Sequence, residues 1–248
     1  MIPASAIARS LRLYHDPARR PLLDAFYGRF LQAGDLAFDI GAHVGDRSAS
    51  FLRLGAHVVA VEPQPALQRL LRRLLRSGQV TLVQALVGAT PGEATLHLNT
   101  ANPTVATAST AFIAAARGAP GWEGQRWDAA ITLPVTTLDA LIAAHGMPHF
   151  VKIDVEGFEA AVLCGLSAAP RALSFEFTTI QREVALIALA RCVALGYAAF
   201  NAALGESMRL HFPQPVAAEA VAEWLRSLPI EANSGDIYAT LEPERLLA

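Results

Sequence analysis

Short apolar runs alternate with amphipathic stretches along most of this chain. A short apolar run bounded by glycine, proline or polar residues is typical of a buried strand, and apolar residues spaced about three to four apart are typical of a helix. The first pattern occurs at residues 35–40, 57–62, 80–87, 150–155 and 172–177, and the second at 45–55, 65–78, 136–146, 156–166 and 182–196. Strands that alternate with helices in this way predict a parallel sheet with helices on both faces.

The two ends of the chain extend this pattern. Helices are expected up to about Leu31, before the first strand. The last fifth of the chain adds three strand-like runs and one more helix, at residues 197–204, 207–212, 236–241 and 218–228 respectively. Since 248 residues fit one α/β domain with a small appendage, we expect a helical segment over residues 1–33 and an α/β domain over residues 34–248.

One long segment breaks the alternation. Residues 91–130 are rich in glycine, proline, threonine, alanine and asparagine, and contain only a short strand-like run at 94–98. A connection this long inside a compact domain is usually a lid or a binding loop. The sequence therefore predicts a loop that covers a site.

Composition and charge exclude several classes of protein. Apolar residues make up 53% of the chain and charged residues 17%, which indicates a globular protein. The net charge of −2 gives no general attraction to nucleic acid or to an anionic membrane surface, and no apolar run reaches the ~18 residues that span a bilayer. Cys164 and Cys192 both lie in apolar helical patterns, which is typical of reduced thiols in the cytoplasm.

The first candidate chemistry is a glycine turn in the stretch FDIGAHVGD, residues 38–46. Gly41 and Gly45 lie between a predicted strand and a predicted helix, where a backbone without side chains can turn tightly beside a ligand. Glu62 ends the next strand, 23 residues beyond Asp39. Because neighbouring parallel strands end side by side, Glu62 is placed to accept hydrogen bonds from both hydroxyls of a ribose.

The spacing of the glycines bears on which nucleoside-containing cofactor binds. A dinucleotide site has G-x-G-x-x-G and rests a pyrophosphate on backbone amides, whereas this chain has G-x-x-x-G bracketed by Asp39 and Asp46. Two carboxylates disfavour a phosphate and favour a cofactor with ammonium and sulfonium groups, such as S-adenosylmethionine. A nicotinamide-dependent oxidoreductase and an ordinary glycine turn with a helix-capping aspartate remain open as alternatives.

Five segments in order, FDIGAHVGD, VVAVEPQP, TTLDAL, VKIDVEGFEAAVLCGL and LSFEF, resemble the FkbM family of S-adenosylmethionine-dependent methyltransferases. The resemblance covers roughly Asp35 to Thr178. It implies a class I methyltransferase fold, a Rossmann-like doubly wound sheet that is mostly parallel with a reversed last strand, and O-methylation of a hydroxyl on a small molecule or carbohydrate. The family commonly has asparagine where this chain has His43, which leaves the role of that side chain in doubt.

A set of cofactor-binding residues follows from the turn and from the resemblance together. Its members come from the glycine turn, from the ends of the second and third strands and from the charged strand that follows the long loop. They are Asp39, Gly41, His43, Gly45, Asp46, Glu62, Pro63, Gln84, Ala85 and Asp154.

Charged residues alternate along a strand that otherwise reads as buried. Lys152, Asp154 and Glu156 share one face, and the next strand carries Ser174, Glu176 and Thr178 in the same alternation. We expect Lys152 to pair with Glu176, because an unpaired buried charge costs several kcal/mol. This pairing makes Lys152 structural, or a residue that positions a carboxylate, in preference to a base.

The end of the charged strand supplies candidates for a catalytic base. Asp154 is the first choice and Glu156 the second, since open α/β sheets bind ligands at this edge and methyl transfer to a hydroxyl needs its proton removed. His43 is a further candidate, with a pKa suited to the task. Alternatively, Glu156 only favours a helix dipole. The leading interpretation needs no metal, although Asp154, Glu156 and Glu176 offer oxygen ligands suited to Mg²⁺.

Recognition of the acceptor is assigned to the segment 99–112, which has many hydroxyl and amide groups and few charges. Asn102 and Ser109 in this segment, together with Glu176, are the candidate acceptor-binding residues. The expected partner is a small-molecule or glycan acceptor, without nucleic acid or membrane insertion. The oligomeric state stays open, with a homo-oligomer among the options. A binding module of the same fold without catalytic activity is the remaining alternative.

Overall fold

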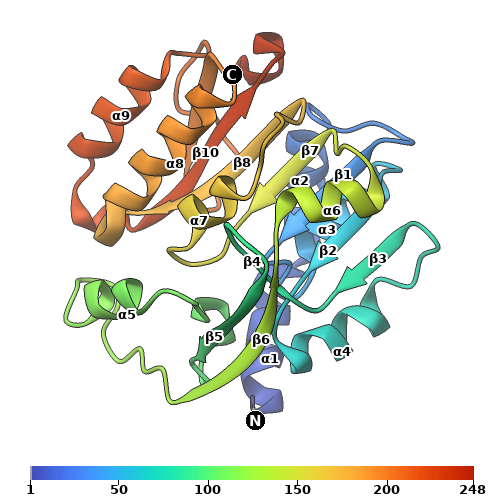
Figure 1. Ribbon diagram of the computed structural model, residues 1–248, viewed down its shortest axis with the longest axis vertical. Helices are drawn as coiled ribbons and strands as arrows, with labels where there is room; N and C mark the ends of the chain where they lie inside the picture. The colour runs from blue at the N-terminus through green and yellow to red at the C-terminus, as the bar shows by residue number, and fades with distance from the viewer. Residues whose placement is uncertain (1) are drawn as a thin grey trace.

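The computed structural model describes residues 2–248 and contains a seven-stranded sheet (Figure 1). The strand order is β3-β2-β1-β7-β8-β10-β9. The strands are β1 (Leu36–Ile40), β2 (His57–Val61), β3 (Val80–Val83), β7 (Phe150–Ile153), β8 (Ala172–Thr178), β9 (Ala199–Leu204) and β10 (Ser234–Thr240). Strand β10 runs antiparallel to both β8 and β9, and the other pairs are parallel. The predicted doubly wound, mostly parallel sheet with a reversed last strand is confirmed.

Helices cover both faces of this sheet. The helices are α1 (Ala4–Tyr14), α2 (Arg20–Tyr27), α3 (Asp46–Arg53), α4 (Pro65–Leu74), α5 (Thr110–Ala116), α6 (Leu138–His145), α7 (Glu159–Cys164), α8 (Arg182–Ala194) and α9 (Ala218–Ser227). Successive strand residues point to opposite faces, so Phe38 packs into a core with α6 to α9 while Ala37 packs into a core with α2 to α4. No helix within residues 2–248 combines the length and apolar character that crossing a bilayer requires.

A second sheet forms from strands within and on either side of the segment predicted as a long loop. Strands β4 (Leu86–Val87), β5 (Gly92–Leu98) and β6 (Ala129–Thr136) pair in the order β4-β6-β5, and α5 lies between β5 and β6. The strand predicted at 94–98 is confirmed as part of β5. Strand β6 and the pairing into a sheet were missed, because half-exposed strands made of small and hydroxyl residues give only a weak alternation. In Figure 1 this sheet stands beside the carboxyl edge of the main sheet.

Two further predicted strands are corrected. The run at 80–87 is two strands, since β3 pairs with β2 in the main sheet whereas β4 pairs with β6 in the second sheet. The run at 207–212 is not a strand. Its amide at Phe212 donates instead to the side chain of Asn201, so the segment is fixed without a ladder of backbone hydrogen bonds.

The close approach of β1 to the end of β7 depends on Gly41. This residue has φ +84°, and a Cβ added to it would lie 1.8 Å from the carbonyl oxygen of Asp154. Gly45 is similar, with φ +81° and a Leu71 methyl 2.6 Å from the position of its missing Cβ. Both glycines were predicted to lie beside a ligand, and close packing is a second reason for a glycine at each position.

We predict that Gly41→Ala lowers the free energy of unfolding by about 3 kcal/mol or more, because it combines a left-handed backbone with a backbone clash. The matched control is Gly34→Ala, which has φ +89° and open space around the missing Cβ, and should lose only about 1–2 kcal/mol. Urea unfolding of both variants measures the difference. Equal losses of unfolding free energy in the two variants would show that the contact between Gly41 and the Asp154 carbonyl does not require a glycine.

Candidate active site

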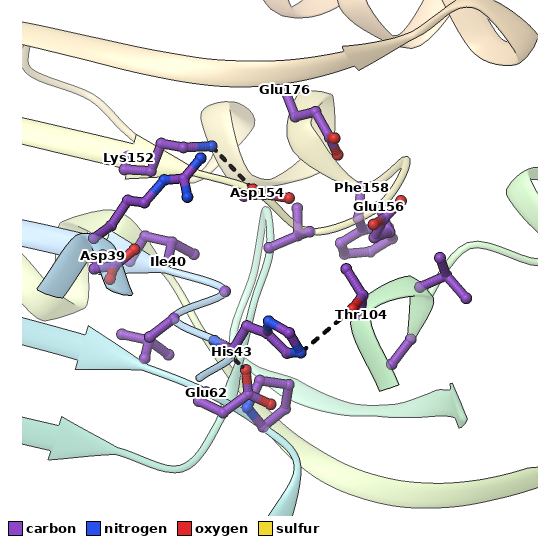
Figure 2. Close-up of a pocket in the computed structure, with 18 of the residues that line it drawn as sticks. Asp39, Ile40, His43, Glu62, Thr104, Lys152, Asp154, Glu156, Phe158 and Glu176 are labelled. Atoms are coloured by element: carbon purple, nitrogen blue, oxygen red, sulfur yellow. Dashed lines mark hydrogen bonds and ion pairs between the residues drawn. The ribbon is translucent and has the colours of Figure 1, made fainter. Parts of the chain in front are cut away.

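A cavity of about 260 Å³ opens at the carboxyl edge of the main sheet. The ends of β1, β2, β7 and β8 and the start of β10 line it, and β4 and the 3-10 turn Pro103–Val105 close it from the side of the second sheet. Figure 2 shows side chains from these elements pointing into one space. Because open α/β sheets bind ligands at this edge, the cavity is the candidate site.

Glu62 forms one end of the cavity. Its side chain is held by two backbone amides, of His43 at 2.9 Å and of Gln64 at 2.8 Å. The residue is only 2% exposed, and burial raises the pKa of Glu62 to about 8, although the two amides act in the opposite direction. Pro63 and Ala85 line the cavity beside it. The carboxylate predicted to hold a ribose is therefore fixed in orientation and faces the cavity.

Asp39 and Asp46 have different electrostatic surroundings. Asp39 accepts a hydrogen bond from the Ser48 hydroxyl at 2.5 Å. Burial raises the pKa of Asp39 to about 6, although this hydrogen bond acts in the opposite direction. Asp46 forms an ion pair with Arg47, which also pairs with Glu206. Asp46 therefore has a cationic partner, whereas Asp39 is held by a hydroxyl group. Arg47 was missed, because nothing in the sequence connects it to Glu206 across 159 positions.

His43 lies between the cofactor turn and the N-terminal helix. Its ring meets Tyr14 edge-on with 5.3 Å between centroids, and its Nε2 lies 3.4 Å from the Thr104 hydroxyl. Burial lowers the pKa of His43 to about 4, so the ring is neutral at neutral pH. Tyr14 also lines the cavity and was missed, since α1 looks like an ordinary surface helix in the sequence. A role for His43 as a base stays a prediction.

Lys152 does not pair with Glu176, and that prediction was wrong. Its ammonium lies 3.0 Å from Asp154 and 2.9 Å from Asp236. In the pairing of β7 with β8, the residue opposite Lys152 is Ser174. Asp236 reaches Lys152 from the antiparallel strand β10. Burial alone would lower the pKa of Lys152, but the two carboxylates outweigh it and hold the pKa well above its usual value. Lys152 is 2% exposed and acts as the internal counterion of two acids.

Asp154 remains ionised because of this pair. Burial would raise the pKa of Asp154, but the adjacent Lys152 ammonium holds it below its usual range. The Asp154 side chain is 36% exposed, and it lines the cavity that also holds Glu62. Figure 2 shows it on the other side of the cavity from Glu62. The first-choice base is thus an oriented carboxylate next to open space.

Glu156 and Glu176 gather beside Asp154. One carboxylate oxygen from each of the three residues lies within 4.8 Å of the others. Burial, followed by the charge of Asp154, raises the pKa of Glu156 and of Glu176 well above the usual value. Glu159, which was missed, accepts hydrogen bonds from the amides of Val155 and Gly157 and so fixes the loop that carries Glu156.

Several predicted residues lie outside the cavity lining. Asn102 donates its amide to Gln125, and the Ser109 hydroxyl accepts from the amide of Phe112 as the cap of α5. The segment 99–112 still reaches the site, through Thr104, Val105, Ala106 and Ala108. Gly45 and Gln84 also lie outside the lining residues, next to members of the lining in sequence. Acceptor recognition by Asn102 and Ser109 therefore has no support from their positions.

A family comparison identifies the domain. The sequence model described as the methyltransferase FkbM domain matches residues 39–225, about three quarters of the chain. The matched range includes the glycine turn, Glu62, Lys152 and all three clustered acids. It leaves out α1, α2 and the reversed strand β10. No curated protein matches the chain.

Solved structures offer distant likenesses. A TehB-like SAM-dependent methyltransferase from Corynebacterium glutamicum is 9% identical with a TM-score of 0.49, over 97% of this chain and 100% of that one. An O-methyltransferase from Bacillus cereus in complex with SAH is 12% identical with a TM-score of 0.45, over 98% and 93%. A precorrin-6y C5,15-methyltransferase from Geobacter metallireducens is 15% identical with a TM-score of 0.42, over 88% and 86%. Likenesses this distant carry no information about the substrate.

Proposed function

The chain belongs to the FkbM methyltransferase family, and from this premise we propose that it transfers the methyl group of S-adenosylmethionine to a hydroxyl oxygen of a small molecule or carbohydrate. The observation that carries the proposal is one cavity with two oriented carboxylates. Glu62 stands at the end formed by the glycine turn, and the ionised Asp154 stands at the end formed by β7 (Figure 2).

The residues around Glu62 fit the cofactor. Each carboxylate oxygen accepts one backbone amide and keeps a second lone pair for a ribose hydroxyl. Gln64 adds a buried side-chain oxygen, Oε1, that has no hydrogen-bond partner among residues 2–248. An unpaired buried acceptor costs about 1–3 kcal/mol, so a donor on a bound ligand would relieve that cost. Ala85 and Leu86 supply an apolar border for the adenine.

The same turn fits a dinucleotide poorly. The amides of Gly41 and Ala42 donate to the carbonyl of Val61, and the amide of His43 donates to Glu62. A pyrophosphate needs free amides at this position, and here these three are already used. Because these amides are occupied, the turn disfavours a nicotinamide dinucleotide as the cofactor.

Asp154 is the proposed base. When bound, S-adenosylmethionine supplies a methyl group activated by a positively charged sulfur. The acceptor hydroxyl has to lie in line with that methyl group and lose its proton as the new oxygen–carbon bond forms. Asp154 would accept this proton directly or through a water molecule, and Lys152 keeps its carboxylate ionised and oriented. Glu156 is the second candidate, and His43 would contact the cofactor side of the cavity.

The lining of the acceptor end supports a small, uncharged or cationic acceptor. Glu176 and Asp236 line this part of the cavity with Asp154, and Phe158 and Trp122 add aromatic surface. A polyanion such as nucleic acid would be repelled by these acids. A hydroxyl-rich molecule, in contrast, can donate hydrogen bonds to them and pack a sugar face or a ring on the aromatic side chains.

We predict that Glu62→Ala weakens the binding of S-adenosylmethionine by about 1–3 kcal/mol, because both ribose hydroxyls lose their acceptor. Isothermal titration calorimetry measures the affinity. The exposed Glu93 on β5 supplies the matched control, since Glu93→Ala removes an acid of the same size away from the cavity and should leave the affinity unchanged. An unchanged affinity in Glu62→Ala would remove the assignment of Glu62.

For catalysis, we predict that Asp154→Asn lowers kcat by about 10²-fold to 10⁴-fold, which is the usual contribution of a general base. The dissociation constant of S-adenosylmethionine should change less than tenfold. An acceptor screen with methyl-labelled donor identifies the substrate, and the variant is then compared with the wild-type protein. Full activity in Asp154→Asn would assign the base elsewhere, and absence of transfer to any acceptor by the wild-type protein would favour a binding module.

A further inference from the structure

Three acids converge at the acceptor end of the cavity. Asp154 follows β7, Glu156 lies in the loop after it, and Glu176 points toward them from β8 (Figure 2). Their oxygens, one from each residue, lie within 4.8 Å of one another. All three carboxylates can carry a charge at this separation only if something positive stands between them.

The chain itself does not supply enough positive charge. Lys152 is shared between Asp154 and Asp236. Glu156 is 7% exposed, and within residues 2–248 its carboxylate has neither a hydrogen bond nor an ion pair. The Oε2 atom of Glu176 is buried and likewise unpartnered in the described chain. The buried Glu156 and the buried Oε2 atom of the half-buried Glu176 therefore face the same space without a cationic partner in the described chain.

The loop geometry holds this arrangement in place. The carbonyl of Glu156 accepts a hydrogen bond from the Thr107 hydroxyl at 2.6 Å, and Glu159 binds the amides on either side of Glu156. Glu156 cannot swing its backbone away from Asp154 without breaking these contacts. The unpartnered carboxylate is thus built into the site and is not a surface side chain free to turn toward solvent.

The spacing fits a hard divalent cation. Oxygens on opposite sides of Mg²⁺ are about 4 Å apart and those on opposite sides of Ca²⁺ about 5 Å apart, which is twice the usual metal–oxygen distance. Oxygens no more than 4.8 Å apart fit around Ca²⁺ as they stand, whereas a pair at that limit would have to draw closer to fit around Mg²⁺. The cluster contains only carboxylates, so it suits Mg²⁺, Mn²⁺ or Ca²⁺ and not zinc.

We propose that Asp154, Glu156 and Glu176 together bind one divalent hard cation at the acceptor end of the cavity. The cation takes one oxygen from each residue, which leaves the oxygen of Asp154 that faces Lys152 in its ion pair. Remaining coordination positions open toward the cavity. This proposal goes beyond the proposed function, since it stands on the three carboxylates and its test needs no acceptor. It also bears on the base, because Asp154 would then hold the cation with one oxygen and Lys152 with the other, and would accept a proton only through the lone pairs left on those oxygens.

Titration of the unliganded 248-residue protein with MgCl₂, MnCl₂ or CaCl₂ tests the proposal. Calorimetry follows binding of each cation, and the loss of the electron paramagnetic resonance signal of free Mn²⁺ follows binding of Mn²⁺. We expect one cation per chain. Glu176→Gln and Glu156→Gln should each weaken binding at least tenfold. Glu62→Ala is the matched control, because it removes an acid from the other end of the same cavity, and it should retain the affinity for the cation.

The outcomes separate this proposal from the proposed function. Circular dichroism and thermal melting show whether each variant is folded, and Glu176→Asp replaces Glu176→Gln if the latter is unfolded. A wild-type protein that binds S-adenosylmethionine but none of the three cations would overturn the cation site and leave the methyltransferase proposal intact. Cation binding that is unaffected by both glutamine variants would also overturn it. Cation binding lost in both variants would support the site even if no methyl acceptor is found.

Discussion

The buried ammonium of Lys152 is the interaction on which the rest of the site depends. It lies between Asp154 at the end of β7 and Asp236 on β10, and so joins a parallel strand to the reversed strand across β8. Breaking such a buried ion pair typically costs about 3–5 kcal/mol, because the remaining charge is left without a partner. The same contact keeps Asp154 ionised. One lysine thereby fixes both the shape of the sheet edge and the charge of the proposed base.

The strand order explains how the two ends of the cavity come together. Strand β1 lies between β2 and β7, so the carboxylate that follows β2 and the carboxylate that follows β7 flank the same glycine turn. Gly41 allows this, since its missing side chain lets β1 end against the carbonyl of Asp154. The second sheet and Tyr14 of α1 then cover the opening. Cofactor and acceptor would meet where these two ends face each other.

The sequence was informative where chemistry follows local pattern and much less so where it depends on distant contacts. The main sheet and the position of Glu62 at the end of β2 could be predicted, because alternation and the end of a strand are local features. The pairing of Lys152 could not, since Asp236 lies 84 positions later and reaches Lys152 only once β10 is reversed. Part of β5 was predicted, but β6 and the pairing of the second sheet were missed, because these strands are half exposed and low in large apolar residues. Glu159 was missed because its partners are backbone amides. Arg47 was missed because its partner Glu206 lies in a loop far along the chain.

The central claim is that the cofactor spans the cavity from Glu62 to the edge at Asp154. A crystal structure of the protein with S-adenosylhomocysteine tests it most directly. If the cofactor lies this way, both ribose hydroxyls will be within hydrogen-bond distance of the Glu62 carboxylate and the sulfur will face the space beside Asp154. An adenosyl group bound away from Glu62, or a sulfur turned away from Asp154, would show that the cofactor does not span the cavity.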